Sequence, residues 1–295
     1  MIKSVLKPFP VLAFCALLLG GAAIGFAGIM MRLSDVNPVA SAFWRMALAA
    51  PLLWIWAWAS AGGDRAAGLR TDYSRVLLLA GFFFAADMGV WHVSLHFTTV
   101  ANATLLPNMA PLCIAAWLWY RYKARFSRGF LVGMALAVGG AVLLVGPSVG
   151  LGGTRLLGDG LGLLVAGFYA AYQLAIKDGR ASYSTARLMA WSTSITALFL
   201  LPFALLMPGD FWPASAPAWL PLLGLALICQ IGGQTVITYA FAHLPSSLSS
   251  ISLLIQPLTA AVAAWLIFGE AIGPVQMAGG AVLLLGIYVA KRGST

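Results

Sequence analysis

Three ionisable side chains lie within stretches of the sequence that are otherwise apolar. Arg45 lies in FWRMALAA, and Asp87 and His92 lie in FFFAADMGVWHVS. Burying such side chains among apolar residues of a membrane is costly, so each requires a structural or functional reason. A guanidinium group can bind a carboxylate, whereas an aspartate or a histidine can bind and release a proton. These residue types therefore indicate recognition of an anionic group and proton transfer.

Arg45 has two interpretations. It could bind a carboxylate of a substrate, or it could form a structural ion pair with Glu270 or Asp35. We prefer the ion pair with Glu270, because a buried arginine usually needs a fixed partner. Asp87 and His92 are candidates for proton coupling, although His92 could equally be a core histidine bonded to a neighbouring carbonyl group.

Polar and aromatic side chains recur at the spacing of helical turns. Residues three or four apart share one face of a helix, as Met88 and His92 would, and as Gln230 and Gln234 would farther along the chain. Both faces could line a central cavity, whereas the glutamines could instead form hydrogen bonds between helices. The candidate substrate-binding residues are Phe84, Met88, Trp91, His92, Asn108, Tyr169, Gln173, Gln230, Gln234, Thr238 and Gln256.

The overall composition identifies the class of protein. The chain has 295 residues, of which 61% are hydrophobic and only 8% are charged, whereas about a quarter of the residues of soluble domains are charged. A disordered chain would be polar and poor in aromatic residues. Soluble and disordered proteins are thereby excluded, and a membrane protein with many spans remains.

The sequence carries no recognisable motif of an enzyme or a metalloprotein. Cys15, Cys113 and Cys229 lie in apolar stretches, and their spacing fits neither a CxxC motif nor a Cys/His ligand set. A phosphate-binding Walker loop and an HExxH motif are also missing. We therefore expect no enzymatic activity, no cofactor and no bound metal.

Apolar stretches long enough to cross a membrane as helices recur along the whole chain. Short links rich in glycine, proline and aspartate separate them. We predict ten spans, at residues 11–31, 37–59, 75–97, 100–120, 128–147, 158–177, 185–207, 216–240, 246–268 and 273–290.

The charges in the links predict how the chain is oriented. If the N-terminus is cytoplasmic, nearly all lysines and arginines of the links lie on the inner side, while Asp35, Asp159 and Asp210 lie on the outer side. Cytoplasmic loops carry an excess of positive charge. We therefore predict a bacterial-type inner-membrane protein with both termini in the cytoplasm. The net charge of +9 is attributed to topology, and nucleic-acid binding is not expected.

The two halves of the chain correspond at an offset of 146 residues. Pro111 then aligns with Pro257, and Trp119 with Trp265, although a coincidental alignment of apolar helices is the alternative. With five spans each, residues 1–148 and 149–295 must have opposite orientations. Inverted repeats are typical of transporters, which bind substrate near the middle of the membrane. The predicted fold is thus an all-α membrane protein with ten transmembrane helices in two inverted five-helix repeats around a central cavity.

The sequence also resembles a known family of transporters. Residues 240–289 are similar to the C-terminal repeat of EamA-type members of the drug/metabolite transporter superfamily. The motifs that carry the resemblance are Pro257, Gly269-Glu270 and Pro274-Val275-Gln276. Arg45 matches an arginine that is usual in the second span of this family. The first half departs from the pattern, because it has Lys123-Ala124 where Gly-Glu is common.

The resemblance implies transport, and it is nearest to the bacterial exporters of aromatic amino acids and other metabolites. We expect export of small metabolites by alternating access, with amino acids, including aromatic ones, as substrates. The alternatives are efflux of a drug or another metabolite and, outside transport, a membrane receptor or scaffold. The expected partners are a small-molecule substrate and the lipid bilayer, and the sequence leaves a monomer or a dimer open.

Overall fold

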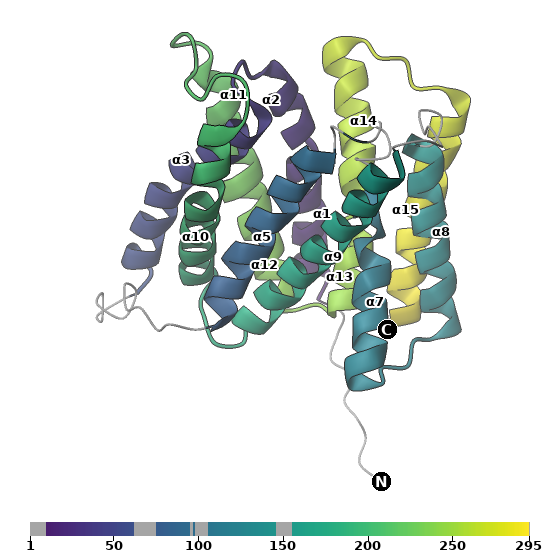
Figure 1. Ribbon diagram of the computed structural model, residues 1–295. Helices are drawn as coiled ribbons and strands as arrows, with labels where there is room; N and C mark the ends of the chain where they lie inside the picture. Colours follow the sequence, from purple (N-terminus) through teal and green to yellow (C-terminus); the bar gives the residue numbers. More distant parts are fainter. Residues whose placement is uncertain (1–9, 62–74, 95–96, 98–105, 146–154, 295) are drawn as a thin grey trace.

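The computed structural model describes residues 10–61, 75–94, 97, 106–145 and 155–294, and its regular elements there are all helical (Figure 1). They are α1 (Val11–Gly25), α2 (Ala27–Leu33), α3 (Pro38–Ala59), α5 (Arg75–Ser94), the 3-10 turn η1 (Leu106–Met109), α7 (Ala110–Tyr122), α8 (Arg128–Val145), α9 (Arg155–Gly179), α10 (Thr185–Leu206), α11 (Trp219–Gly224), the π-helix η3 (Leu225–Gln234), α12 (Thr235–Phe241), α13 (Ser246–Ser252), α14 (Ile255–Phe268) and α15 (Pro274–Ser294).

The all-helical membrane fold predicted from the sequence is confirmed. Seven helical segments of the described chain are long and apolar enough to cross a membrane. They are Val11–Leu33, Pro38–Ala59, Leu156–Gly179, Thr185–Leu206, Trp219–Phe241, Ser246–Phe268 and Pro274–Ser294. Helices α5, α7 and α8 occupy the other predicted spans, and the count of ten spans stays a prediction.

Local sequence sets the starts of the corresponding helices α3 and α10. The side chain of Asn37 accepts a hydrogen bond of 2.8 Å from the backbone N–H of Ala40. Ser184 accepts one of 3.2 Å from the backbone N–H of Arg187 in the same way. Such capping side chains satisfy backbone donors that have no partner within the helix. Polar residues between apolar stretches thus fix where these two helices begin.

Helix ends also recur at the offset of 146 residues. Helix α7 ends at Tyr122 and α14 ends at Phe268, and each is followed by a residue in the left-handed conformation. These residues are Lys123, with φ 51°, and Gly269, with φ 69°. A left-handed residue commonly ends a helix, and glycine adopts this conformation at a lower cost than lysine. The position of the turn is therefore shared by both halves even though the residue type differs.

Helices α8 and α15 pack antiparallel along one edge of the bundle (Figure 1). Gly133 lies against Ala290, and Gly140 lies against Leu283. The repeat offset relates these contacts to two others. Adding 146 to the number of each glycine and subtracting 146 from that of its partner gives the pairs Gly279–Leu144 and Gly286–Ala137, which are also in contact. The packing of these two helices therefore has approximate twofold symmetry.

Helices α3 and α10 pack against each other on the opposite side of the bundle (Figure 1). The indole N–H of Trp54 donates a hydrogen bond of 2.9 Å to Ser194, and its ring lies edge-on to Trp191. Near the other end of this pair, the side chain of Asn37 donates to the carbonyl of Ala204 at 3.2 Å. The start of α3 thus lies beside the end of α10, so this pair is antiparallel as well.

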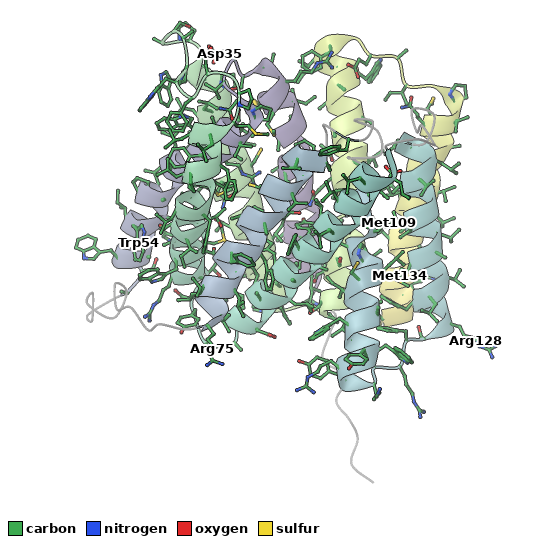
Figure 2. All side chains as sticks on the ribbon, in the orientation of Figure 1. Asp35, Trp54, Arg75, Met109, Arg128 and Met134 are labelled. Atoms are coloured by element: carbon green, nitrogen blue, oxygen red, sulfur yellow. The ribbon has the colours of Figure 1, made fainter. Side chains whose placement is uncertain are left out.

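Charged side chains distinguish the two ends of the bundle. Figure 2 places Asp35 at one end and Arg75 and Arg128 at the other. The last turn of α15, which carries basic residues, adjoins the start of α8, because Ser127 donates a hydrogen bond to the carbonyl of Gly293. We call these the Asp35 end and the Arg75 end.

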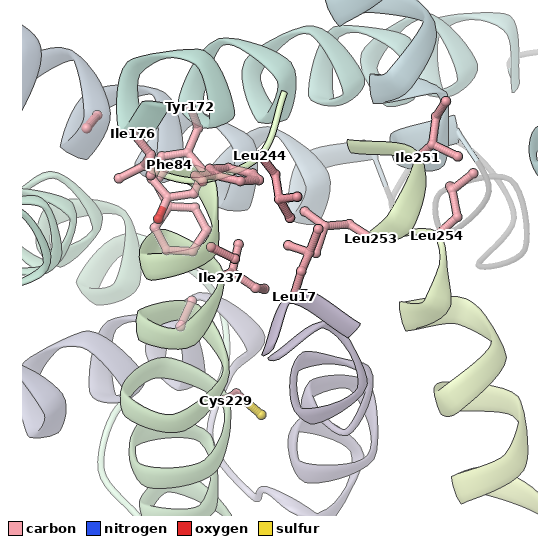
Figure 3. Packing of buried hydrophobic residues seen from close by; sticks show 14 of the residues in the cluster. Leu17, Phe84, Tyr172, Ile176, Cys229, Ile237, Leu244, Ile251, Leu253 and Leu254 are labelled. Atoms are coloured by element: carbon pink, nitrogen blue, oxygen red, sulfur yellow. The ribbon is translucent and has the colours of Figure 1, made fainter. Parts of the chain in front are cut away.

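Buried hydrophobic residues from many helices form one core, and Figure 3 shows part of it from close by. Leu17 of α1, Phe84 of α5, Tyr172 of α9 and Ile237 of α12 meet there, and all are less than a tenth exposed. Four separate segments of the chain thus contribute to one packed layer.

Candidate substrate-binding cavity

A cavity of about 530 Å³ lies among α1, α2, α3, α5, α9, α14, η1 and η3. This volume is within the range of small-molecule sites. Helix α5 starts at the Arg75 end, and it contributes residues from its second half, between Phe84 and Trp91. The cavity is therefore displaced toward the Asp35 end. Its lining residues are Ile24, Gly25, Ala27, Gly28, Met31, Arg32, Ala42, Arg45, Phe84, Asp87, Met88, Trp91, Pro107, Asn108, Val165, Tyr169, Leu225, Gln234, Gln256, Pro257 and Ala260.

Arg45 of α3 is a buried cation in the wall of this cavity, with 6% of its surface exposed. Its Nε donates a hydrogen bond of 3.0 Å to Oε1 of Gln230, whose Nε2 donates one of 2.9 Å to Thr193. Within the described chain, its buried Nη2 has no hydrogen-bond partner. One side of the guanidinium group is thus fixed, while a donor on the other side remains available.

Asp87 of α5 lines the same cavity. Its charge interacts with that of Arg45, but the two side chains form no ion pair in the described parts of the structure. The same parts provide Asp87 with no hydrogen bond. The cavity therefore contains a cation and a carboxylate that do not neutralise each other directly.

A stack of aromatic rings adjoins the cavity on the side nearer the Arg75 end. The rings of Phe84 and Tyr172 are parallel within 9°, with their centroids 4.3 Å apart. The hydroxyl of Tyr172 accepts a hydrogen bond of 2.8 Å from Nε2 of Gln234, and that of Tyr169 accepts one of 3.0 Å from Nε2 of Gln256. Figure 3 shows the buried hydrophobic side chains that surround the stack. The stack and its hydrogen bonds therefore form a packed layer on the side of the cavity nearer the Arg75 end.

Most residues proposed from the sequence as substrate-binding lie in the wall of this cavity. Their roles in binding stay predictions, but the structure brings them together from five separate elements. Those that line the cavity are Phe84, Met88, Trp91, Asn108, Tyr169, Gln234 and Gln256. His92 belongs to α5, but its side chain lies outside the part of the chain that the structure describes.

The candidate residues Gln230, Gln234 and Thr238 do not all face the cavity. Gln234 lines the cavity. Gln230 instead accepts the hydrogen bond from Nε of Arg45, and the hydroxyl of Thr238 donates to the sulfur of Met189 at 3.1 Å. The physical reason is the π-helix from Leu225 to Gln234, whose wider turns break the register of an α-helical row.

Gln173 also lies away from the cavity lining. It is 2% exposed, and in the described chain neither its Nε2 nor its Oε1 has a hydrogen-bond partner. Helical spacing predicts that Gln173 shares a face of α9 with Tyr169. The residues of α9 that line the cavity are Val165 and Tyr169, which are closer to the start of the helix.

The expected ion pair between Arg45 and Glu270 does not form in this structure. Glu270 instead pairs with Arg32, whose guanidinium carbon also lies 4.3 Å from the ring centroid of Phe268. Asp35 accepts a hydrogen bond of 3.0 Å from the backbone N–H of Ala214. Glu270 and Arg32 are both about half exposed near the Asp35 end. Arg45 is buried deeper, and its guanidinium group donates a hydrogen bond to Gln230 instead of pairing with Glu270.

Sequence reasoning missed the contribution of α1 and α2 to the cavity. Ile24, Gly25, Met31 and Arg32 line it, although nothing in their types or spacing indicates a binding face. The helix is interrupted at Phe26, between α1 and α2, and residues on both sides of this interruption line the cavity. Pro257, which the family resemblance singled out, is also in the wall.

The sequence model of the EamA-like transporter family matches residues 11–146 and matches again at residues 156–291. The chain belongs to the EamA-like transporter family. The two matches cover both halves of the molecule, and they identify it as a multi-pass membrane protein of a family of transporters.

Several curated relatives of this EamA-like transporter are exporters or transporters by name. An uncharacterised transporter of Archaeoglobus fulgidus is 28% identical over 273 residues, covering 90% of this chain and 91% of the relative. A probable terminal-alkyne amino-acid exporter of Streptantibioticus cattleyicolor is 26% identical over 285 residues, covering 95% and 89%. A pseudopaline exporter of Pseudomonas aeruginosa is 24% identical over 219 residues, covering 74% and 75%.

A solved crystal structure shares the fold of this EamA-like transporter. The two superpose with a TM-score of 0.80 at 17% sequence identity, covering 96% of each chain. The overall helix arrangement therefore recurs in a protein of distant sequence.

Proposed function

We propose that this EamA-like transporter exports small metabolites, foremost amino acids including aromatic ones, across a bacterial-type inner membrane. The observation that carries the proposal is the cavity, whose wall combines aromatic rings, thioethers and amides with the carboxylate of Asp87 and two arginines, Arg45 and Arg32, of which Arg32 is paired with Glu270. Such a lining suits a small amphiphilic solute. The named amino-acid exporter among the relatives supports the same substrate class.

The proposed mechanism is alternating access by ten spans in two inverted five-helix repeats, residues 1–148 and 149–295. The antiparallel, approximately twofold packing of α8 with α15 supports opposite orientations of the halves. Basic residues at the Arg75 end support a cytoplasmic location of that end, with both termini there. In this orientation the structure has its cavity toward the outside and its aromatic stack toward the cytoplasm.

We propose that Asp87 and His92 bind and release the protons that are coupled to transport. Asp87 lies in the cavity, where its charge interacts with that of Arg45, and the neutral hydroxyl-bearing side chain of Tyr169 lines the same cavity. A carboxylate shared by protons and substrate would link their movements. Without this link, export would follow the gradient of the substrate alone.

Two other functions are retained. Efflux of a drug or another metabolite is favoured by the pseudopaline exporter among the relatives. A membrane receptor or scaffold would use the cavity for binding without transport. We expect no cofactor and no enzymatic step, and the oligomeric state is left open.

Flux measurements test the proposal. Purified protein in proteoliposomes should move amino acids from a panel that includes phenylalanine, leucine and threonine, and a pH gradient should increase the net flux. Replacing Trp91, which lines the cavity, with alanine should raise KM about tenfold or more, since about 1.4 kcal/mol of binding energy corresponds to tenfold. The same change at Trp119, which is 61% exposed on α7, is the control.

The outcomes separate the candidate functions. Flux of drugs or other metabolites without flux of any amino acid would favour the second function. A complete lack of flux with retained ligand binding would favour the receptor. Equal KM values for the Trp91 and Trp119 variants would contradict the assignment of the cavity.

A further inference from the structure

We propose that Arg45 and Asp87 determine substrate specificity by binding the two backbone charges of one zwitterionic amino acid. Arg45 would bind the α-carboxylate and Asp87 the α-ammonium group. This inference rests on the proposed function and deepens it, because it assigns each charge of the substrate to one side chain.

The first support is the incomplete hydrogen bonding of Arg45. Its Nε is held by Gln230, which is itself held by Thr193, so the orientation of the guanidinium group is fixed. Its Nη2 is buried and, among the described residues, unpartnered. Leaving a buried charged donor without a partner is unfavourable, because the group has lost its water and gained no acceptor in exchange. A carboxylate entering the cavity would supply the missing acceptor with favourable, charge-assisted geometry.

The second support is the position of Asp87. It belongs to α5, whereas Arg45 belongs to α3, and both line the same cavity without forming an ion pair. An amino acid carries its two charges on groups that are bonded to the same α-carbon. Such a molecule can therefore bridge a cation and a carboxylate that do not reach each other.

Charge balance favours a zwitterion over an acid or an amine. A simple acid would pair with Arg45 and leave Asp87 unpaired, and a simple amine would do the reverse. Unpaired charge is costly in the low-dielectric interior of a membrane protein. A zwitterion satisfies both groups and adds no net charge to the cavity, so the loaded site need not carry additional charge through the membrane.

The rest of the wall is suited to a hydrophobic side chain. Met88 follows Asp87 directly on α5, Trp91 lies one turn farther along the same helix, and Tyr169 lines the same cavity from α9. A substrate held by its backbone at Arg45 and Asp87 would place its side chain against these apolar and aromatic groups. The charges would then set the class of substrate, and the apolar wall would tolerate several side chains.

Analogues that lack one charge test the assignment. Flux or competition is measured in proteoliposomes with phenylalanine, phenethylamine, which lacks the carboxylate, and 3-phenylpropionate, which lacks the ammonium group. Wild-type protein should prefer phenylalanine over each analogue by about tenfold or more, that is about 1.4 kcal/mol. Arg45→Gln should abolish the preference over phenethylamine and retain that over phenylpropionate, whereas Asp87→Asn should do the reverse.

Matched variants keep the test independent of folding. Arg45→Lys and Asp87→Glu preserve each charge and should retain part of the discrimination, while the elution profile on gel filtration and the thermal stability report whether each variant is folded. If the replacements do not fold, the preference of the wild type among the three ligands still decides: equal affinities overturn the proposal.

The proposed function and this inference can fail separately. Flux of phenylalanine with the same analogue preferences in wild type, Arg45→Gln and Asp87→Asn would overturn the inference and leave amino-acid export standing. Flux of other solutes with none of any amino acid would overturn both.

Discussion

At the scale of single residues, Tyr172 connects segments that are far apart in the sequence. Its side chain is fully buried, its ring stacks on Phe84 of α5, and its hydroxyl accepts a hydrogen bond from Gln234 of η3. The stack joins the two proposed halves on the side of the cavity nearer the Arg75 end, and the hydrogen bond, which lies within the second half, holds the side chain of Tyr172 in place. We expect them to stabilise the conformation in which the cavity faces outward.

Removing the hydroxyl while keeping the ring tests this role. Tyr172→Phe retains the aromatic stack but leaves Nε2 of Gln234 without its acceptor, which costs about 1–3 kcal/mol. We expect faster labelling by an impermeant maleimide, from the proposed cytoplasmic side, of a cysteine introduced by Ile176→Cys after replacement of Cys15, Cys113 and Cys229. An unchanged labelling rate relative to the Tyr172 parent would refute the role.

At the scale of elements, helix ends and helix type position the site. The π-helix η3 turns Gln230 toward Arg45 and leaves Gln234 at the cavity. Lys177, near the end of α9, donates hydrogen bonds of 2.5 Å and 2.8 Å to the carbonyls of Phe241 and Leu244. These carbonyls lie at and after the end of α12, where a positive charge is favourable. Lys177 therefore fastens α9 to the end of α12.

Loss of this cap should loosen the contact between the two helices. We expect Lys177→Met to lower stability by about 1.5–3 kcal/mol, the usual contribution of a hydrogen bond to a charged group. The measurement is thermal unfolding in detergent, with Lys177→Arg as the variant that keeps a charged donor. If methionine and arginine have the same effect, the hydrogen bonds to α12 are not the cause.

At the scale of the whole molecule, the bundle depends on close backbone contact between α8 and α15. A Cβ atom at Gly140 would lie 2.3 Å from the backbone nitrogen of Leu283 and 2.7 Å from the carbonyl oxygen of Gly279. In a membrane, helices associate through tight packing of small residues, because lipid chains are as apolar as the helix surfaces. Glycine at this contact allows two backbones to approach.

Neighbouring glycines provide a matched test of that contact. We expect Gly140→Leu to destabilise the protein by about 1–3 kcal/mol or more, the usual cost of overpacking, and to reduce the monodisperse fraction on gel filtration. Gly139→Leu adds the same side chain in the same helix where no atom lies within 4 Å, so it should be tolerated. Equal behaviour of both variants would show that the contact does not limit stability.

The site could be predicted in part because several of its residues lie on one helix. Asp87, Met88 and Trp91 belong to the same stretch of α5 and line the cavity together, as helical spacing indicates. Gln230 lies behind the cavity wall and not in it, because its helix departs from α-helical geometry. Glu270 pairs with Arg32 and not with the expected Arg45, because Arg32 of α2 lies next to it. Neither a π-helix nor an interruption such as that at Phe26 has a reliable signature in residue types.

The sequence by itself determined the class of fold, the approximate spans and the short set of buried ionisable residues. These properties are local, because hydropathy, helical period and capping residues act within one segment. Only the tertiary structure decided that Gln230 holds Arg45, whose Nη2 has no partner among the described residues, that Asp87 shares its cavity, and that Tyr172 stacks on Phe84 in the cavity wall. Contacts between distant segments depend on how helices pack in three dimensions, and helical spacing within one segment carries no information about which neighbour it meets.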